Sequence, residues 1–300
     1  MKILEYISDE YLKSNSYLGE LKEEIIKENA GIKKEVNIKY PEPTKIRIST
    51  MTIISKFNSI IDIDTLYDFL EVNEDCNKYP RIDFVKYGGD KIKGNTKKNK
   101  KKKNKKNYFQ NQLTICILLN INQKINMKLF KNGKIQLTGI KDVNIINIGC
   151  VYVTGLINKI DETEKIIENI ETFKYVDNDY DIVLINSDFK VNYLLNRDNI
   201  FKLLSNLNFF VIYEPDIYPG VNLKYFINSN NKEKGICNCT EKCNGKGNCI
   251  GDGNCKRVTI AIFQSGSIII TGSKNNDQVQ ECFKFINKLL RDNFYKIIDN

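Results

Sequence analysis

The sequence predicts an α+β protein with an antiparallel sheet built from two similar halves. Two segments carry this prediction, Phe130-Lys-Asn-Gly-Lys-Ile-Gln-Leu-Thr-Gly139 and Phe263-Gln-Ser-Gly-Ser-Ile-Ile-Ile-Thr-Gly272. Each has an aromatic residue, a glycine three positions on and an alternating run that ends in Thr-Gly, which is typical of a β-hairpin. They begin 133 residues apart, a separation that indicates a duplicated domain rather than a short-period repeat. Strands in runs, with the helices segregated from them, favour the α+β class.

Two further pairs of segments follow the same spacing. Leu66-Tyr-Asp-Phe-Leu70 resembles Ile200-Phe-Lys-Leu-Leu204, and both open helical runs of apolar residues. Tyr79-Pro80 resembles Tyr218-Pro219 at a similar offset. We therefore expect a first repeat over 44–175 and a second over 176–300.

The first half is preceded by a segment over 1–43 with helical spacing, which we expect to be an N-terminal helical extension that packs on the domain or on a partner. Pro41 and Pro43 separate this extension from the first repeat. The alternating pattern then predicts strands over 45–57, 79–87, 113–119 and 124–130, followed by the hairpin. Helices are expected from about 63 to 72 and within 143–170. A lysine-rich insertion is expected over 88–108.

The second half repeats this plan. Strands are expected over 182–191, 221–227, 258–263 and 267–271, with helices over 198–207 and 277–298. A cysteine-rich insertion spans 229–256. Both insertions are expected at the same place, between the strand that contains Tyr-Pro and the hairpin. Long surface insertions are tolerated because closing a loop costs little more as it lengthens.

The charge is concentrated in one run. The net charge is +9, and eight lysines between positions 97 and 106 account for all but +1 of it. Such a run often contacts polyanions, and the alternative is a merely solvated loop. The chain has no histidine, which excludes histidine triads, bases and metal ligands. It also lacks a phosphate-cradling Gly-Lys-Ser/Thr loop and a carboxylate cluster at a recognisable spacing, so we expect no enzyme.

The two hairpins and Tyr213-Glu-Pro-Asp-Ile-Tyr-Pro-Gly220 resemble the repeat signatures of the TATA-binding protein family, most of all the divergent versions in giant DNA viruses. The resemblance covers roughly residues 44–298. It implies a pseudo-twofold saddle, in which two repeats share a curved antiparallel sheet and the helices lie on the convex side. The connection after the Tyr-Pro strand would be the stirrup loop beside the DNA.

The resemblance also implies which residues meet DNA. Aromatic wedges that pry base steps apart would be Phe130 and Phe263, with Tyr218 and Tyr79 as their neighbours. The alternative is that these aromatics are core or hairpin-packing residues. For Phe263 the alternation argues against this, because Val258, Ile260 and Ile262 would face the helices. The DNA-facing positions also include Thr138, Thr271, Lys128, Gln136 and Ile269.

The two halves differ on that face. Thr138 and Thr271 match threonines of the family, while Lys128 and Gln136 stand where the family has apolar residues. The family's asparagines on the groove floor have no clear match: Thr52 or Lys56 falls at the first position, and Leu184, with Asn186 nearby, falls at the second. We therefore expect recognition of AT-rich DNA through shape, charge and bending.

The function expected is that of a transcription factor that binds and bends AT-rich promoter DNA through the minor groove and nucleates a viral initiation complex. Its partners would be double-stranded DNA, a protein similar to transcription factor IIB and the RNA polymerase machinery. The alternative is a protein-interaction scaffold with the same fold and weak or no specific DNA binding. The sequence has no membrane span or signal peptide, so we expect an intracellular protein, in the host cytoplasm (viral factory) or the virion.

The cysteine-rich insertion is the second candidate site. Nine cysteines in an intracellular protein favour metal binding or free thiols over disulfides. Cys237, Cys239, Cys243 and Cys255 are the expected ligands of one tetrahedral zinc, with Cys249 left over. The alternative is a glycine-rich loop with reduced thiols. The remaining cysteines, Cys76, Cys116, Cys150 and Cys282, lie in apolar runs and are expected in the core.

Overall fold

The structure is a computed structural model that describes residues 40–72, 78–88, 91–94 and 111–299. By its internal contacts, residues 41–300 form one compact unit. The N-terminal extension expected over 1–43 lies outside the described residues except for 40–43. The eight lysines at 97–106 lie outside them as well.

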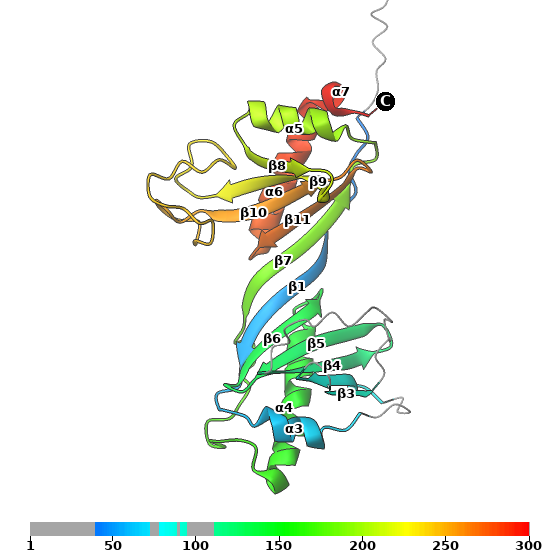
Figure 1. Cartoon of the computed structure of the whole chain (residues 1–300), viewed down its shortest axis with the longest axis vertical. Coiled ribbons are helices and arrows are strands. Elements are labelled where there is room, and N and C mark those ends of the chain that lie inside the picture. Colours follow the sequence, from blue (N-terminus) through cyan, green and yellow to red (C-terminus); the bar gives the residue numbers. More distant parts are fainter. Residues whose placement is uncertain (1–39, 73–77, 89–90, 95–110, 300) are drawn as a thin grey trace, which may run out of the picture. The chain divides into compact units, whose positions relative to one another are not determined.

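The described chain is α+β, as predicted (Figure 1). The first half contains, in order, β1 (Arg47–Lys56), α3 (Ile63–Phe69), β2 (Arg81–Tyr87), β3 (Lys91–Gly94), β4 (Gln112–Asn120), β5 (Gln123–Phe130), β6 (Lys134–Ile140) and α4 (Ile145–Glu164). The second half contains β7 (Asp181–Lys190), α5 (Arg197–Asn206), β8 (Phe210–Glu214), β9 (Tyr218–Ile227), β10 (Lys256–Ile262), β11 (Ser267–Ser273), α6 (Asn276–Asp292) and α7 (Phe294–Ile297).

All described strands belong to one antiparallel sheet of eleven strands, in the order β3-β2-β4-β5-β6-β1-β7-β11-β10-β9-β8. The strands β1 and β7 pair at its centre and join the two halves (Figure 1). Read outward from this centre, β6, β5, β4 and β2 correspond to β11, β10, β9 and β8. The strand β3 is an addition at the edge of the first half.

Two turns at equivalent places need glycine. Gly133 has φ +76°, and a Cβ there would lie 2.3 Å from the carbonyl oxygens of Phe57 and Ser59. Gly266 has φ +75°, and its Cβ would lie 2.4 Å from the carbonyl oxygen of Val191. Only glycine tolerates both the positive φ and this backbone approach. Each turn therefore docks its hairpin on the segment that follows the central strand of its own half.

Each half has its own hydrophobic core between helices and one face of the sheet. In the first half α3 and α4 cover residues such as Ile53, Ile115 and Leu137. In the second half α5, α6 and α7 cover Leu223, Ile260 and Ile270. Burial of these aliphatic side chains supplies the main driving force for folding. Within the described residues no helix is both long and apolar enough to cross a bilayer.

The equivalence of Tyr79-Pro80 with Tyr218-Pro219 is wrong. Tyr79 precedes β2, which corresponds to β8, whereas Tyr218 begins β9, which corresponds to β4. The expectation that both insertions share one place is wrong for the same reason. The lysine run lies between β3 and β4, while the cysteine-rich insertion lies between β9 and β10.

Three elements differ from their expected form. The edge strands β3 and β8 were not predicted; β8 is short and its residues alternate between exposed and half-buried, so it carries little hydrophobic signal. The closing helix expected over 277–298 is interrupted at Asn293, which separates α6 from α7. The Asn293 side chain donates a hydrogen bond to the Leu289 carbonyl (2.9 Å), and such a bond competes with the continuing helix.

Candidate nucleic-acid interface and cysteine cluster

The hairpins of both halves present one face to the helices and leave the other face, here called the open face, in contact with solvent. The residues toward the helices are buried: Ile125, Met127, Leu129, Ile135, Leu137, Val258, Ile260, Ile262, Ile268 and Ile270. The alternate residues Asn126, Lys128, Phe130, Gln136, Thr138, Thr259, Phe263, Ile269 and Thr271 are half-buried. The predicted alternation is thus confirmed except at Ala261, which is buried although it belongs to the open face, and none of the half-buried residues on this face is sealed under a helix.

In the second half two predicted aromatics come together. The rings of Tyr218 and Phe263 meet edge to face with centroids 5.7 Å apart. A Cβ on Gly220 would lie 2.9 Å from Tyr218 Cε1 and 3.1 Å from Phe263 Cε1. Both rings therefore rest on the bare backbone of β9 at Gly220, which fixes them as one aromatic unit on the open face.

In the first half Phe130 lines a hollow of about 580 Å³ on the same face. Ile54 and Gln136 line it with Phe130, and Lys131 and Lys134 stand at its side. The hollow is thus lined by one aromatic residue and two lysines. An anionic ligand such as the nucleic-acid backbone would be attracted to this place.

Tyr79 occupies a different position. Tyr79 is 39% exposed, and the guanidinium of Arg81 lies over its ring, 5.6 Å from the centroid. Leu113 pairs with Leu129 in the first half, and Val221 pairs with Ile262 in the second. Because these two pairs are equivalent, the first-half counterpart of Tyr218 is residue 110, which is outside the described residues.

At the centre of the sheet the registers resolve the uncertain groove-floor positions. Thr52 pairs with Thr138 across β1 and β6, and Asn186 pairs with Thr271 across β7 and β11. Thr52 and Asn186 therefore occupy equivalent places. The Thr271 hydroxyl donates a hydrogen bond to Asn186 Oδ1, so the donors that this pair can offer a ligand are the Asn186 amide N–H groups.

The open face is more polar in the first half than in the second. Lys128 pairs with Gln136 on β5 and β6, whereas Ala261 pairs with Ile269 on β10 and β11 at the corresponding place. This confirms the predicted difference. The second half adds one carboxylate, Asp188, which lies opposite Ile269 and forms an ion pair with Arg47 at 2.8 Å.

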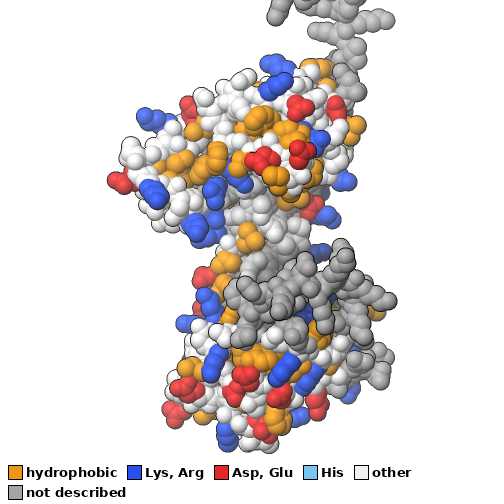
Figure 2. Space-filling model, viewed as in Figure 1, with side chains coloured by type: hydrophobic (Ala, Val, Ile, Leu, Met, Phe, Trp, Pro, Cys, Tyr) orange, Lys and Arg blue, Asp and Glu red, His pale blue; other side chains and the backbone are white. Residues whose placement is uncertain are grey.

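Cations of the second half gather where the open face meets the cysteine-rich insertion. Lys224 Nζ donates to Thr259 Oγ1 at 3.1 Å. Burial, with the nearby positive charge of Arg257, lowers the pKa of Lys224. Elsewhere lysine, arginine and acidic side chains are interspersed over the face shown in Figure 2. The described surface therefore carries no single large field of one sign in this view.

The cysteine-rich insertion brings together the four predicted ligands. The sulfurs of Cys237, Cys239, Cys243 and Cys255 all lie within 4.8 Å of one another. Cys255 Sγ is 3.4 Å from Cys239 Sγ and 3.6 Å from Cys237 Sγ. These separations exceed the roughly 2.05 Å of a disulfide bond. The cluster thus consists of four free thiols.

Backbone N–H groups donate to two of these sulfurs, those of Cys237 and Cys243. Burial raises the pKa of Cys243, but N–H groups of Gly245 and Cys255 donate to its sulfur and hold the pKa below its usual value. Cys249 lies outside the cluster and its sulfur accepts a hydrogen bond from Gln278 Nε2 at 3.3 Å. Cys116, Cys150 and Cys282 are buried core residues, as predicted, and Cys76 lies outside the described residues.

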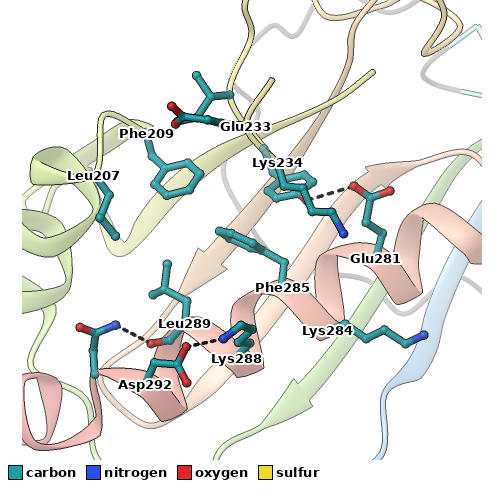
Figure 3. Close-up of a pocket in the computed structure, with 13 residues that line it drawn as sticks. Leu207, Phe209, Glu233, Lys234, Glu281, Lys284, Phe285, Lys288, Leu289 and Asp292 are labelled. Atoms are coloured by element: carbon teal, nitrogen blue, oxygen red, sulfur yellow. Dashed lines mark hydrogen bonds and ion pairs between the residues drawn. The ribbon is translucent and has the colours of Figure 1, made fainter. Parts of the chain in front are cut away.

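The helix side of the second half carries a hollow of about 580 Å³ beside α6 (Figure 3). Its floor is aromatic: the Phe285 ring lies 4.7 Å from that of Tyr225 and 5.3 Å from that of Phe209. The Tyr225 hydroxyl donates to Glu281 at 3.0 Å. Glu233 and Lys234, at the start of the insertion, line the opposite rim.

Three comparisons relate this geometry to known proteins. The family model described as "Transcription factor TFIID (or TATA-binding protein, TBP)" matches residues 182–293. A "TATA-box-binding protein-like" protein of Acanthamoeba polyphaga mimivirus is 31% identical over 274 residues, which are 86% of this chain and 68% of the relative. The solved structure of Methanococcus jannaschii TBP aligns with a TM-score of 0.48 and 16% identity, covering 83% of this chain and 99% of that chain.

Proposed function

The chain belongs to the TATA-binding protein family of non-enzymatic, DNA-binding transcription factors, and we propose that it binds AT-rich promoter DNA through the minor groove and bends it. The open face is the proposed binding surface. In the ensuing complex the protein nucleates initiation by a viral transcription machinery. The two halves act as repeats, each of which engages one half of the site.

One observation carries the proposal: the aromatic unit of the exposed Tyr218 and the half-buried Phe263, seated over Gly220 on the face opposite the helices. An aromatic side chain on that face buries little apolar area in the free protein. Inserted between base steps, it would unstack them and bend the duplex. Phe130 does the same for the first half.

The central residues fit the minor groove. An A·T pair offers acceptors there, on adenine N3 and thymine O2, so the amide donors of Asn186 have partners at every A·T step. Thr52, at the equivalent place in the first half, carries a smaller donor. The polar pair Lys128–Gln136 adds charge contacts in place of apolar ones. Recognition by shape and deformability follows, with AT-rich steps preferred.

Other surfaces complete the proposal. The hollow beside α6 (Figure 3) takes a protein of the initiation machinery, such as a factor similar to transcription factor IIB or the polymerase. The lysine run at 97–106 contacts phosphates that flank the bent site. The protein acts at the site of viral transcription in the infected cell. Zinc is expected in the 229–256 insertion, on Cys237, Cys239, Cys243 and Cys255.

The test is equilibrium binding to an AT-rich duplex by fluorescence anisotropy, comparing the wild-type chain with the Phe130→Ala/Phe263→Ala variant. Loss of two wedges that each contribute about 1–3 kcal/mol predicts at least a tenfold weaker complex. A GC-rich duplex of the same length is the control for charge-driven binding. Equal affinity of both proteins for the AT-rich duplex would overturn the proposal.

The polar first half favours one alternative, a scaffold that keeps the fold and binds protein partners alone. The pairing of Lys128 with Gln136 is the observation behind it. Replacing both by the residues of the second half, Lys128→Ala with Gln136→Ile, distinguishes the two functions. Under DNA binding this variant changes affinity for DNA, whereas under the scaffold function it leaves DNA binding absent as before.

A further inference from the structure

The geometry points to a structural zinc ion held by the thiolates of Cys237, Cys239, Cys243 and Cys255, which fastens the 229–256 insertion to the start of β10. This inference is independent of the proposed DNA function. It concerns a metal site in a loop, and its evidence comes from sulfur positions and packing.

The sulfur positions match a tetrahedral site. Zinc binds thiolate sulfur at about 2.3 Å, so the sulfurs of a regular tetrahedron lie about 3.8 Å apart. The measured separations of 3.4 and 3.6 Å, within a cluster no wider than 4.8 Å, are close to that edge. Four sulfur ligands close the coordination shell, as in structural rather than catalytic zinc sites.

The insertion has no core that could hold it in place. Residues 228–255 are all described, and they form neither a helix nor a strand. The two aliphatic side chains of the segment stay in contact with solvent: Ile236 is half-buried and Ile250 is 66% exposed. Among the cluster, Cys255 is fully buried. A loop of this length with so little apolar burial needs a cross-link to keep one conformation.

Neighbouring side-chain and backbone groups donate hydrogen bonds to the sulfurs of the cluster, as they do around metal ligands. Asn228 Nδ2 donates to Cys255 Sγ at 3.4 Å and to the Gly251 carbonyl at 2.7 Å. The N–H groups of Gly245 and Cys255 donate to Cys243, and that of Cys239 donates to Cys237. Such donors hold the sulfurs in a fixed orientation.

A neighbouring turn is held separately. The Asp252 carboxylate accepts hydrogen bonds from the backbone N–H groups of Thr240 and Glu241, both at 2.8 Å. This links the 251–254 turn to the stretch between Cys239 and Cys243. The metal would therefore connect three stretches of the chain: the one with Cys237 and Cys239, the one with Cys243 and the one with Cys255.

Cys249 is the internal control. It has the same residue type, the same loop and similar exposure, but its sulfur contacts Gln278 of α6 instead of the cluster. The site therefore predicts that Cys249→Ser keeps the metal and that Cys243→Ser loses it. A loop that binds metal through any available thiol would not discriminate between the two.

The experiment uses the full chain, purified under reducing conditions, with zinc counted by plasma mass spectrometry. We expect about one zinc per chain in the wild type and in Cys249→Ser, and a loss of at least tenfold in Cys243→Ser. Cobalt(II) in place of zinc should give the charge-transfer absorption of a tetrahedral tetrathiolate. Removing the metal from wild-type protein with a chelator should open Lys242 and Lys246 to trypsin.

Several results would overturn the inference. Wild-type protein without zinc after incubation with the ion, or a Cys249→Ser variant as metal-free as Cys243→Ser, would refute the site. Bound iron with the visible absorption of an iron tetrathiolate would refute zinc as the metal. If Cys243→Ser does not fold, the cobalt spectrum and the Cys249→Ser count still decide. Because none of these readouts uses DNA, failure here leaves the proposed function untouched.

Discussion

Gly220 is the position where a single methyl group should damage DNA bending without damaging the fold. The alanine Cβ would lie 2.9 Å from Tyr218 Cε1 and 3.1 and 3.2 Å from Phe263 Cε1 and Cζ. Ordinary contacts begin near 3.4 Å, so both rings must retreat by a few tenths of an ångström. The backbone at Gly220 is outside the left-handed region, so alanine itself is tolerated there.

The size of the effect depends on the two rings. An edge-to-face pair contributes about 0.5–1.5 kcal/mol beyond its buried area, and here the rings keep solvent contact, so we expect the free energy of unfolding to fall by less than about 1 kcal/mol. Displaced rings would insert poorly between base steps. A loss of about 1–1.4 kcal/mol in binding corresponds to roughly a five- to tenfold weaker complex.

The assay is anisotropy with an AT-rich duplex, paired with urea unfolding of the same preparations. Gly155→Ala is the matched control: a Cβ there meets nothing within 4 Å on the exposed side of α4. It should bind DNA as the wild type does and gain about 0.5–1 kcal/mol of stability. If Gly220→Ala binds and bends DNA like the wild type, the aromatic unit is not the wedge.

Three further changes test other parts of the account. Arg47→Ala leaves the Asp188 carboxylate unpaired on the open face and should weaken DNA binding several-fold at low salt. Adding Asp188→Asn should restore the affinity. Additive losses of affinity in the double variant would contradict this. The Asp62 side chain caps α3 by accepting a hydrogen bond from the Thr65 backbone N–H. Asp62→Ala removes this cap and should lower the free energy of unfolding, measured in urea, by about 1 kcal/mol. The hydrogen bond from Thr65, opposed by slight burial, lowers the pKa of Asp62. The cap therefore stabilises the fold above the unfolded pKa of about 3.9, and this stabilisation fades as pH falls through the folded pKa. If Asp62→Ala lowered the free energy of unfolding by the same amount at low pH, the result would be inconsistent with the cap. Deleting 95–107 should flatten the dependence of DNA affinity on salt while sparing β3, and an unchanged slope would dismiss phosphate contacts by this run.

The alternation of the hairpins was enough to predict the open face. In a strand successive side chains point to opposite faces, so the apolar run Val258, Ile260, Ile262 fixed the side on which Phe263 had to lie. The buried and half-buried residues follow this pattern on both hairpins, except that Ala261 is buried as well. Periodicity of this kind depends on local geometry alone, which is why sequence reasoning succeeded there.

Pairing across the sheet could not be predicted in the same way. Tyr-Pro occurs in both halves, but β2, β3 and the lysine run separate it from β4 in the first half, so the motif precedes β2 there and begins β9 in the second half. The groove-floor positions at the centre of the sheet could not be assigned from the sequence for a related reason. The β1–β7 register shifts after Ile48 and after Thr52, and each shift moves the alignment by a residue. The equivalence of Thr52 and Asn186 follows instead from their pairing with Thr138 and Thr271 on the two hairpins.

The cysteine cluster was predicted in part. Spacing alone selected four of five thiols, and the structure brings those four together and leaves Cys249 in contact with Gln278 of α6. The supporting Asn228 was missed because it precedes the cysteines and carries no motif. Its role depends on the turn that returns Gly251 and Cys255 to the end of β9.

The central claim is that rings on the open face bend DNA, and the most direct measurement is the end-to-end distance of an AT-rich duplex labelled with a donor and an acceptor. Wild-type protein at saturation should shorten this distance, and Phe130→Ala/Phe263→Ala at saturation should leave the duplex close to straight. An equally bent duplex with the double variant, or a straight one with the wild type, would contradict the account.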